Sequence, residues 1–496
     1  MSGGLRALNL ELVVASRVEA AGAEWALTAD GRLAVASDRP DPVLADLEGV
    51  TQGHERGTVL LGPRSPRNAL ALRRHLGWLR PCPLGTRTSA GLGDRLGLAT
   101  PGHVRAVRAV GGGIAAIFPQ QSIREMTRTG RTPTEVMDDA TWGQFAEGWK
   151  DGTGADADHL KTTADVDACL AAGFSLFTID PGEHVDSSAD GADLATLRAR
   201  AAALPWGDLE DGEPALRQRY LGRSFAVEHL RIGFDEATLL RAAAKYGRAV
   251  AHVARMSRHL LKQAGTRAVE LEVSVDETET PTSPAEHYWV AAELKRLGVS
   301  WVSLAPRFVG RFEKGVDYIG DLAALERDIA AHAALARHFG PYKLSLHSGS
   351  DKFSVYPIAA RLARGLVHLK TAGTSYLEAL RTVAAVDPAL FRAIYAFARE
   401  RYETDKASYH VSAELGRTPE AADVPQADLP SLLEQFDARE VLHVTFGSVL
   451  KEAGADGRPR FKDALLGLLR AHPDAYAQNL ERHFARHLRP FVGVRS

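Results

Sequence analysis

The residues best suited to chemistry lie on an apolar run with a polar residue at every second position. Residues 269–276 read Val-Glu-Leu-Glu-Val-Ser-Val-Asp. Successive side chains of a strand point to opposite faces, so one face would carry Glu270, Glu272, Ser274 and Asp276. Carboxylates this close repel one another in apolar surroundings unless a cation or a proton compensates them. We therefore expect a cation or a proton beside this strand; the alternative is an edge strand with a solvated polar face.

Two later apolar runs would bring basic groups to the same place. Alternation puts Lys343, Ser345 and His347 on one face of their strand, and His368 and Lys370 on one face of the next. A single histidine in a strand is more often structural than a metal ligand. Several of them converging with carboxylates favour a metal site.

A third run ends in Asp158 and His159. Imidazole and carboxylate groups together suit zinc, nickel, manganese or cobalt, with open positions left for substrate. We predict His159, Glu272 and His347 as metal ligands. Asp276 is the rival of Glu272, because both lie on the same strand face.

Cationic side chains follow several of the predicted strands: Arg124, Lys161, Arg307, Lys352 and Lys370. Guanidinium and ammonium groups bind carboxylates well, so this pattern favours a small anionic substrate. The alternative is that each cation pairs with a nearby acidic residue. We expect Arg124 or Lys352 to bind a substrate carboxylate, and Gln121 and Ser122 to bind hydroxyl groups. Further candidate substrate contacts are Lys161, Arg307, Asp351, Thr371 and His410.

Short apolar strands alternate with helices in the elements that must position these residues. We predict strands at 96–100, 114–120, 154–159, 174–180, 269–276, 301–305, 343–347 and 366–370. Eight such units are the number that closes a (β/α)₈ TIM-type barrel. Polar residues follow nearly every strand, which favours a barrel over a doubly wound sheet with a single switch point. Closure requires strand 96–100 to pair with strand 366–370.

The rest of the chain is predicted to surround this α/β barrel. Residues 1–90 should form a small N-terminal α+β segment with a strand at 57–62 and a helix at 68–79. Residues 91–390 should form the catalytic barrel, with a helical insertion at about 187–265. Residues 391–496 should form a C-terminal helical extension.

Composition excludes several classes of protein. The 496 residues carry a formal net charge of -2, so no general positive field would attract nucleic acid. Two cysteines without C-x-x-C spacing suit a reducing cytoplasm. We see neither a signal peptide nor an apolar run long enough to span a membrane, and we expect a cytoplasmic protein. No G-x-G-x-x-G or Walker A motif follows a strand. A homo-oligomer is left open.

Long stretches of the sequence resemble the tagaturonate/fructuronate epimerase family, which has relatives with tagatose 4-epimerase activity. The resemblance covers roughly residues 90–415, in segments that include 93–102, 120–130, 155–161, 177–184, 272–281, 304–309, 344–353, 368–376 and 402–412. It implies an isomerase of carbohydrate metabolism that inverts C4 of a ketose. The substrates would be D-tagaturonate and D-fructuronate, the two hexuronate-derived ketoses, or D-tagatose and D-fructose. No nucleic-acid or membrane partner is implied.

A more distant resemblance suggests the mechanism. Asp158-His159 and the segment 346–350 are similar to parts of the class II ketose-bisphosphate aldolases. The inverted carbon is not next to the ketone, so its hydrogen is not acidified; retro-aldol cleavage and re-addition at a metal-bound ketone would invert it. Asp158 is the expected base, with Asp180 and Glu183 as alternatives. Without a metal, a Schiff base on Lys370 would be the alternative. An aldolase and a non-catalytic sugar-binding or aldolase-accessory subunit are the competing functions.

Overall fold

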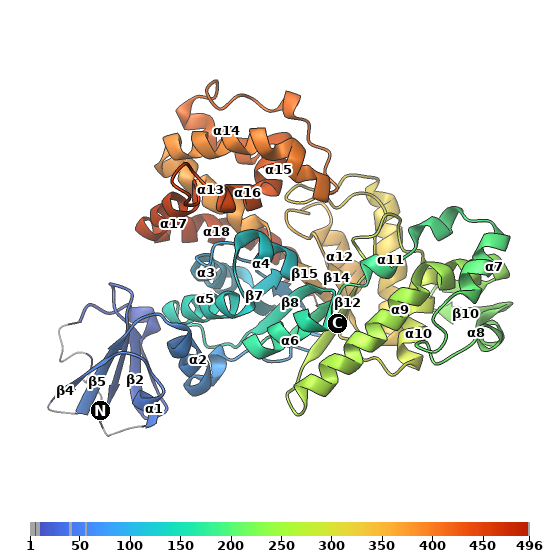
Figure 1. Cartoon of the computed structure of the whole chain (residues 1–496), viewed down its shortest axis with the longest axis horizontal. Helices are drawn as coiled ribbons and strands as arrows, with labels where there is room; N and C mark the ends of the chain where they lie inside the picture. The colour runs from blue at the N-terminus through green and yellow to red at the C-terminus, as the bar shows by residue number, and fades with distance from the viewer. Residues whose placement is uncertain (1–4, 6–9, 39–41, 55–56, 495–496) are drawn as a thin grey trace.

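Eight parallel strands close into a barrel at the centre of the molecule (Figure 1). The computed structural model describes residue 5 and residues 10–38, 42–54 and 57–494. The strands, in order around the barrel, are β6 (Ser89–Gly91), β7 (Ala115–Ser122), β8 (Gly154–Leu160), β9 (Leu176–Ile179), β12 (Glu270–Ser274), β13 (Ser303–Ala305), β14 (Lys343–Leu346) and β15 (Val367–Lys370). The predicted (β/α)₈ barrel is therefore confirmed.

The first barrel strand differs from the predicted one. Residues 96–100 form no strand: the Asp94 carboxylate accepts the backbone N–H groups of Leu96, Gly97 and Ala99 at 2.9, 2.9 and 2.6 Å and holds them in a turn. The closing strand is instead β6, which pairs in parallel with residues 368–370 of β15. This strand has only three residues, Ser-Ala-Gly, and all three are small. It is therefore too short to give a strand signal in the sequence.

Helices surround the barrel, as the alternation of strands and helices predicts. They are α3 (Thr100–Val110), α4 (Ile123–Thr129), α5 (Pro133–Ala146), α6 (Thr163–Ala172), α9 (Glu236–Ala264), α10 (Pro284–Arg296), α11 (Leu322–Phe339), α12 (Tyr356–Ala363) and α13 (Thr374–Val386). Capping boxes begin α5, α6 and α10, at Thr132, Thr162 and Ser283. These caps fix where each helix starts after its strand, and so where the intervening loop lies.

A separate antiparallel sheet precedes the barrel. Its strand order is β1 (Val18–Ala20), β2 (Ala23–Leu27), β3 (Leu33–Ser37), β5 (Gly57–Gly62) and β4 (Val50–His54), next to α1 (Pro42–Ala45). The predicted strand at 57–62 is thus present. The predicted helix at 68–79 is α2 (Pro66–His75), followed by a 3₁₀ turn at Gly77–Leu79. Figure 1 shows this sheet on the far side of α2 from the barrel.

The segment between β9 and β12 is mostly helical, as predicted. It contains α7 (Leu194–Ala202), α8 (Glu213–Tyr220) and the 29-residue helix α9, whose buried face packs on α6, α7 and α10. It also holds an unpredicted hairpin of β10 (Arg223–Val227) and β11 (Leu230–Phe234). Most residues of this hairpin are at least partly exposed, so their sequence lacks a clear apolar alternation.

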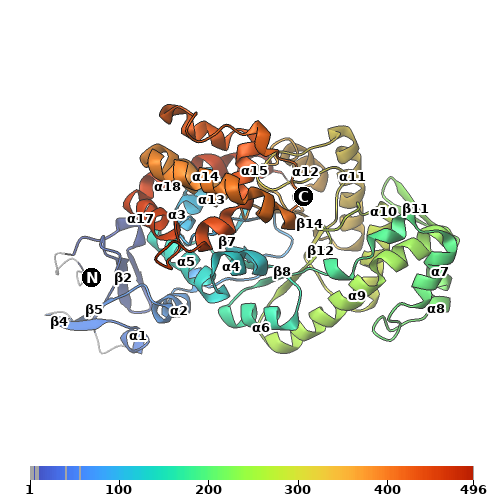
Figure 2. The same ribbon diagram turned by 45° about the horizontal axis from the view of Figure 1, so that its top comes forward.

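Helices make up the C-terminal part of the chain, as predicted. They are α14 (Pro388–Asp405), α15 (Phe436–Val444), α16 (Phe446–Lys451), α17 (Lys462–Ala471) and α18 (Pro473–Leu488). Figures 1 and 2 show them beside α3 and α4, and α18 packs along α3 and α13. Within the part of the chain that is described, we find no helix with the length and apolarity needed to cross a membrane.

Candidate active site

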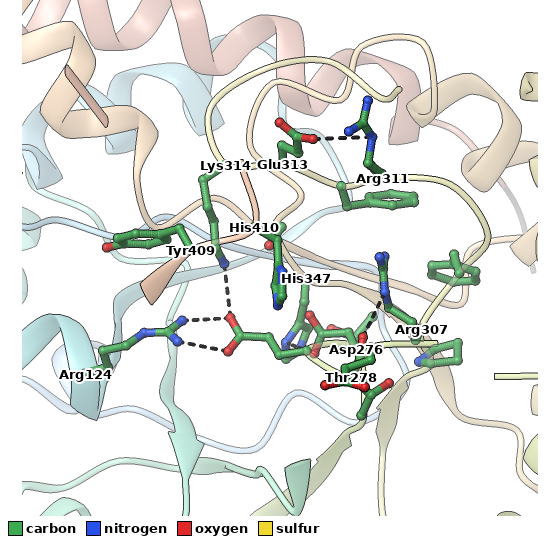
Figure 3. Close-up of a pocket in the computed structure, with 17 residues that line it drawn as sticks. Arg124, Asp276, Thr278, Arg307, Arg311, Glu313, Lys314, His347, Tyr409 and His410 are labelled. Atoms are coloured by element: carbon green, nitrogen blue, oxygen red, sulfur yellow. Dashed lines mark hydrogen bonds and ion pairs between the residues drawn. The ribbon is translucent and has the colours of Figure 1, made fainter. Parts of the chain in front are cut away.

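A cavity of about 290 Å³ opens at the carboxyl-terminal end of the barrel strands (Figure 3). Its walls come from the ends of β12, β13 and β14 and from Tyr409 and His410 of the C-terminal extension. A second cavity, of about 40 Å³, is lined by Asp158, His159 and Lys370. Residues such as Arg124 and His347 line both cavities, so the two adjoin. The carboxyl-terminal end of a barrel is where active sites of this fold lie.

Two histidines meet where the cavities join. The distance between His159 Nε2 and His347 Nδ1 is 3.3 Å, and the two rings are nearly perpendicular. His159 has a φ of 51° and lies where the pairing of β8 with β9 shifts register between Ala157 and Leu160. Residues other than glycine seldom adopt this left-handed conformation, and such local irregularity often serves to aim a side chain. Here it turns the His159 imidazole toward His347.

Carboxylates lie against both ring nitrogens of His347. Glu272 Oε1 is 2.7 Å from Nε2, whereas Asp276 Oδ1 is 3.1 Å from Nδ1. Asp276 thus lies on the side of the ring that faces His159, and Glu272 lies on the opposite side. Burial disfavours the charged imidazole, but Asp276 and Glu272 together raise the pKa of His347 to about 9.

His159 is likewise surrounded by acidic groups. Asp180 Oδ2 is 3.3 Å from its Nδ1, while Asp158 Oδ1 and Glu277 Oε1 are 3.9 and 4.0 Å from its Nε2. Burial opposes the charge, yet Asp158, Glu277 and Asp180 raise the pKa of His159 to about 10. The other oxygen of Asp180 accepts the backbone N–H of Gly182 at 2.8 Å. Asp180 is therefore placed to orient the ring of His159 from behind.

Lys370 lies deeper in the barrel, among three carboxylates. Its Nζ is 2.7 Å from Asp158 Oδ1, 2.7 Å from Glu272 Oε1 and 3.0 Å from Asp156 Oδ2, and it donates to Thr178 Oγ1 at 2.7 Å. Burial works against the ammonium charge, but the three acids raise the pKa of Lys370 above its usual value. A Schiff base needs the neutral amine, so this environment favours the ammonium form of Lys370 over a nucleophile.

Arg124 reaches the cavity but is already paired. Its guanidinium makes two bonds to the Glu277 carboxylate, at 2.7 and 3.0 Å, and Lys314 Nζ approaches the same carboxylate at 3.4 Å. Neither Glu277 nor Lys314 was predicted as a site residue. Strict alternation would point Glu277 away from Asp276, but β12 ends at Ser274, so the alternation no longer applies. Lys314 lies in the loop after β13, where no periodic pattern marks it.

Some of the predicted substrate contacts lie elsewhere. Lys352 is fully buried, and its Nζ donates to the carbonyl oxygens of Glu313, Val316 and Ser350, so it cannot bind a substrate carboxylate. Lys161 pairs with Glu183 at 2.7 Å on the surface, where the Glu183 side chain is 71% exposed. Both lie outside the two cavities.

The remaining predicted contacts divide into two groups. Gln121 and Thr371 are buried and line neither cavity; Thr371 Oγ1 donates to the Gly91 carbonyl at 2.7 Å. Ser122 lines the smaller cavity, where it caps α4 through the N–H of Glu125. Arg307 and His410 line the larger cavity.

Asp351 is the centre of a buried ion-pair network instead of a substrate contact. Its carboxylate is 2.6 Å from His483 Nε2 on α18 and 2.9 Å from Arg439 Nη2 on α15, and it accepts a hydrogen bond from Thr374 Oγ1. Its backbone N–H donates to His487 Nε2 at 3.0 Å, so that nitrogen has no lone pair left for a ligand. The network ties the loop that follows His347 to the C-terminal helices.

Replacing Asp351 by Asn should lower the free energy of unfolding by about 3–5 kcal/mol, because the buried Arg439 loses its counter-charge. Urea-induced unfolding followed by circular dichroism measures the change. Glu326→Gln is the control: Glu326 pairs with Arg361 on the surface at 2.8 Å, and its loss should cost at most about 1 kcal/mol. Equal effects of the two substitutions would contradict the role given to the Asp351 network.

The fold and the site together define a class of protein: a (β/α)₈ barrel with histidines and carboxylates gathered at the carboxyl-terminal ends of its strands, where enzymes of this fold have their active sites. The tagaturonate epimerase (UxaE) family profile matches residues 30–491, and the chain belongs to this family. It is 46% identical over 425 residues to a tagaturonate/fructuronate epimerase of Thermotoga maritima, covering 86% of this chain and 85% of that protein. The resemblance seen in the sequence is thus confirmed.

Solved structures agree with this assignment. The native crystal structure of the fructuronate-tagaturonate epimerase UxaE from Cohnella laeviribosi matches with a TM-score of 0.91 and 39% sequence identity, covering 98% of this chain and 97% of that one. A glycerol complex of the same enzyme matches with a TM-score of 0.90 and 38% identity over the same shares of the two chains. The architecture of the whole described chain is therefore that of the family.

Proposed function

We propose that this enzyme interconverts D-tagaturonate and D-fructuronate by inverting C4, with the help of a divalent metal ion. The names of the relatives supply the substrates. The observation that carries the proposal is the meeting of His159 and His347 with Asp158 and Asp276 at the mouth of the barrel. A cavity of about 290 Å³ beside them suits a ligand the size of one sugar.

The donor groups fit a divalent cation. His159 Nε2 and His347 Nδ1 face each other at 3.3 Å, and two protonated imidazoles in this position would repel. Ligand atoms of Asp158, His159 and His347 lie within 4.8 Å of one another, as do those of His159, Asp180 and Glu277. Neutral imidazoles and ionised carboxylates at such spacing are ligands of zinc, nickel, manganese or cobalt.

Among these groups, we assign His159, His347 and Asp276 as ligands, with Glu277 completing the set. Glu272 lies on the other side of His347 and accepts from Thr178 Oγ1, and it also contacts Lys370 Nζ. We give Glu272 the role of orienting His347, the task that carboxylates commonly perform behind metal-bound imidazoles. A bound divalent ion would polarise the substrate ketone and stabilise the negative charge that forms on it.

The protein's own residues would move the proton. Asp158 takes the proton of the C4 hydroxyl while the C3–C4 bond breaks, which leaves an enediolate and an aldehyde. The aldehyde turns, C3 adds to its other face, and Asp158 returns the proton to the new C4 oxygen. Lys370 Nζ, at 2.7 Å from Asp158 Oδ1, holds this carboxylate in place between cycles. Gln120 Nε2, at 3.4 Å, lies near its second oxygen.

Four sugars distinguish the proposed function from its competitors. Purified enzyme supplied with a divalent ion should convert D-tagaturonate to D-fructuronate and the reverse, as resolved by chromatography. Activity should fall to background after chelation and return when a divalent ion is added back, because the negative charge on the substrate would otherwise be unstabilised. D-tagatose and D-fructose test the neutral substrates.

Other outcomes would replace the proposal. Stable three-carbon products would indicate an aldolase, and full activity after complete removal of metal would refute the metal site. A lack of turnover of all four sugars would favour a sugar-binding or accessory subunit.

A further inference from the structure

The larger cavity contains four Lys or Arg side chains, and most of them are already paired. Arg124 and Lys314 both contact Glu277, at 2.7 and 3.4 Å. Arg311 Nε lies 3.4 Å from Glu313 Oε1, and its side chain is 56% exposed. Arg307 is the exception: among the described residues, no carboxylate lies within 4.0 Å of its guanidinium. The charge of Arg307 is therefore available to a ligand.

Three hydrogen bonds hold Arg307 in place. Its backbone N–H donates to Thr282 Oγ1 at 3.1 Å, and its carbonyl oxygen accepts the N–H of Thr282 at 2.8 Å. Its Nε donates to the Thr278 carbonyl at 3.3 Å. This arrangement uses only Nε and leaves both terminal nitrogens without a partner among the described residues. A guanidinium fixed before binding loses little conformational entropy when a ligand arrives.

Arg307 lies to one side of the histidines in the larger cavity. Figure 3 shows Arg124 on one side and Arg307 on the other, with His347 and His410 between them. A ketose whose reacting carbons lie at His347 would extend one end toward Arg307. Because a uronate carries its carboxylate at the end remote from the ketone, that end and the free guanidinium would meet.

We propose that Arg307 binds the C6 carboxylate of the substrate and so determines the preference for ketouronates over neutral ketohexoses. The assignment rests on the proposed function. It gives Arg307 the role first predicted for Arg124 or Lys352, because Arg124 pairs with Glu277 and Lys352 donates to backbone carbonyl oxygens. Bound at C6, the aldehyde fragment stays in the cavity while C4 turns about the C4–C5 bond. The same contact would thus serve specificity and retention of the cleaved fragment.

Dissociation constants test the proposal separately from turnover. Calorimetry with the metal-loaded enzyme would compare the equilibrated mixture of D-tagaturonate and D-fructuronate with that of D-tagatose and D-fructose. The wild type should bind the ketouronates more tightly. Arg307→Met should weaken ketouronate binding about 10- to 100-fold, because a charge-assisted pair is lost, and change ketohexose binding less than about threefold. Arg307→Lys should recover part of the preference.

Arg311→Met is the matched control, since Arg311 lines the same cavity but is paired with Glu313. It should keep the wild-type preference. The proposal is overturned if the wild type shows no preference, if Arg307→Met weakens both mixtures equally, or if Arg311→Met removes the preference. Tight ketouronate binding without turnover would instead refute the proposed function and leave the role of Arg307 standing.

Discussion

Replacement of His347 by alanine should lower kcat by roughly a thousandfold or more and abolish stoichiometric metal binding. His347 is the group that links the two sides of the site, because its Nδ1 faces His159 and Asp276 while its Nε2 faces Glu272. A metal ion contributes several kcal/mol to stabilising charge in a transition state, and each factor of ten in rate corresponds to about 1.4 kcal/mol. Elemental analysis of dialysed protein and single-turnover assays would measure the two effects.

Two carboxylate variants distinguish a residue that binds the metal from one that only orients a metal-binding histidine. Glu272→Gln should weaken metal affinity about 10- to 100-fold, with activity restored by excess metal, because Glu272 would only orient the imidazole. Asp276→Asn should leave an activity loss that excess metal does not repair. The opposite pattern would make Glu272 the ligand. Its Oε2, buried without a hydrogen-bond partner among the described residues, is the atom that would then bind the metal.

Asp158→Asn should lower kcat by about 10²- to 10⁴-fold while the enzyme still binds metal and substrate. Asparagine preserves the size of the side chain but cannot take a proton from the C4 hydroxyl. The residue lies at the required place: it adjoins His159, contacts Lys370 Nζ at 2.7 Å and lines the smaller cavity. Steady-state assays with D-tagaturonate, combined with the metal content of the variant, would test this role.

The two alternative bases provide the comparison. Asp180→Asn should reduce metal affinity more than the rate at saturating metal, because Asp180 lies behind His159 and bonds to its Nδ1. Glu183→Gln should retain activity within about twofold, since Glu183 is an exposed partner of Lys161 and surface ion pairs contribute little. Near-normal turnover by Asp158→Asn would transfer the role of base to another group.

Much of the barrel follows from sequence because its strands are buried runs with regular spacing. Seven of the eight were placed within a few residues, from β7 to β15, since apolar strands between helices give a strong periodic signal. The missing one, β6, shows the limit. A three-residue strand of small residues is stabilised by its neighbours β7 and β15, and the sequence of the strand itself carries little information about that pairing.

The site was predictable where side chains lie on strands and less so where they lie in loops. Alternation along β12 placed Glu272 in the barrel, and Asp276 and His347, which lie one or two residues beyond the ends of β12 and β14, still reach the same site. Lys352, five residues beyond His347, looked equally suited to bind an anion. Its loop turns away from the cavity, however, and buries the ammonium group among carbonyl oxygens. The alternation of side chains along a strand does not predict such a turn, because the direction of each loop side chain depends on the backbone angles of its own residue.

The segment that carries Tyr409 and His410 makes the active site depend on distant parts of the chain. The backbone N–H groups of Ser412, Ala413 and Glu414 donate to carboxylates of Glu313, Glu440 and Asp437, at 2.8, 3.0 and 2.8 Å. One of these acids lies in the loop after β13, and the other two lie on α15. Anyone who grafts this barrel or shortens it for engineering must therefore carry α15 along, since a version cut after α13 would lose one side of its substrate cavity.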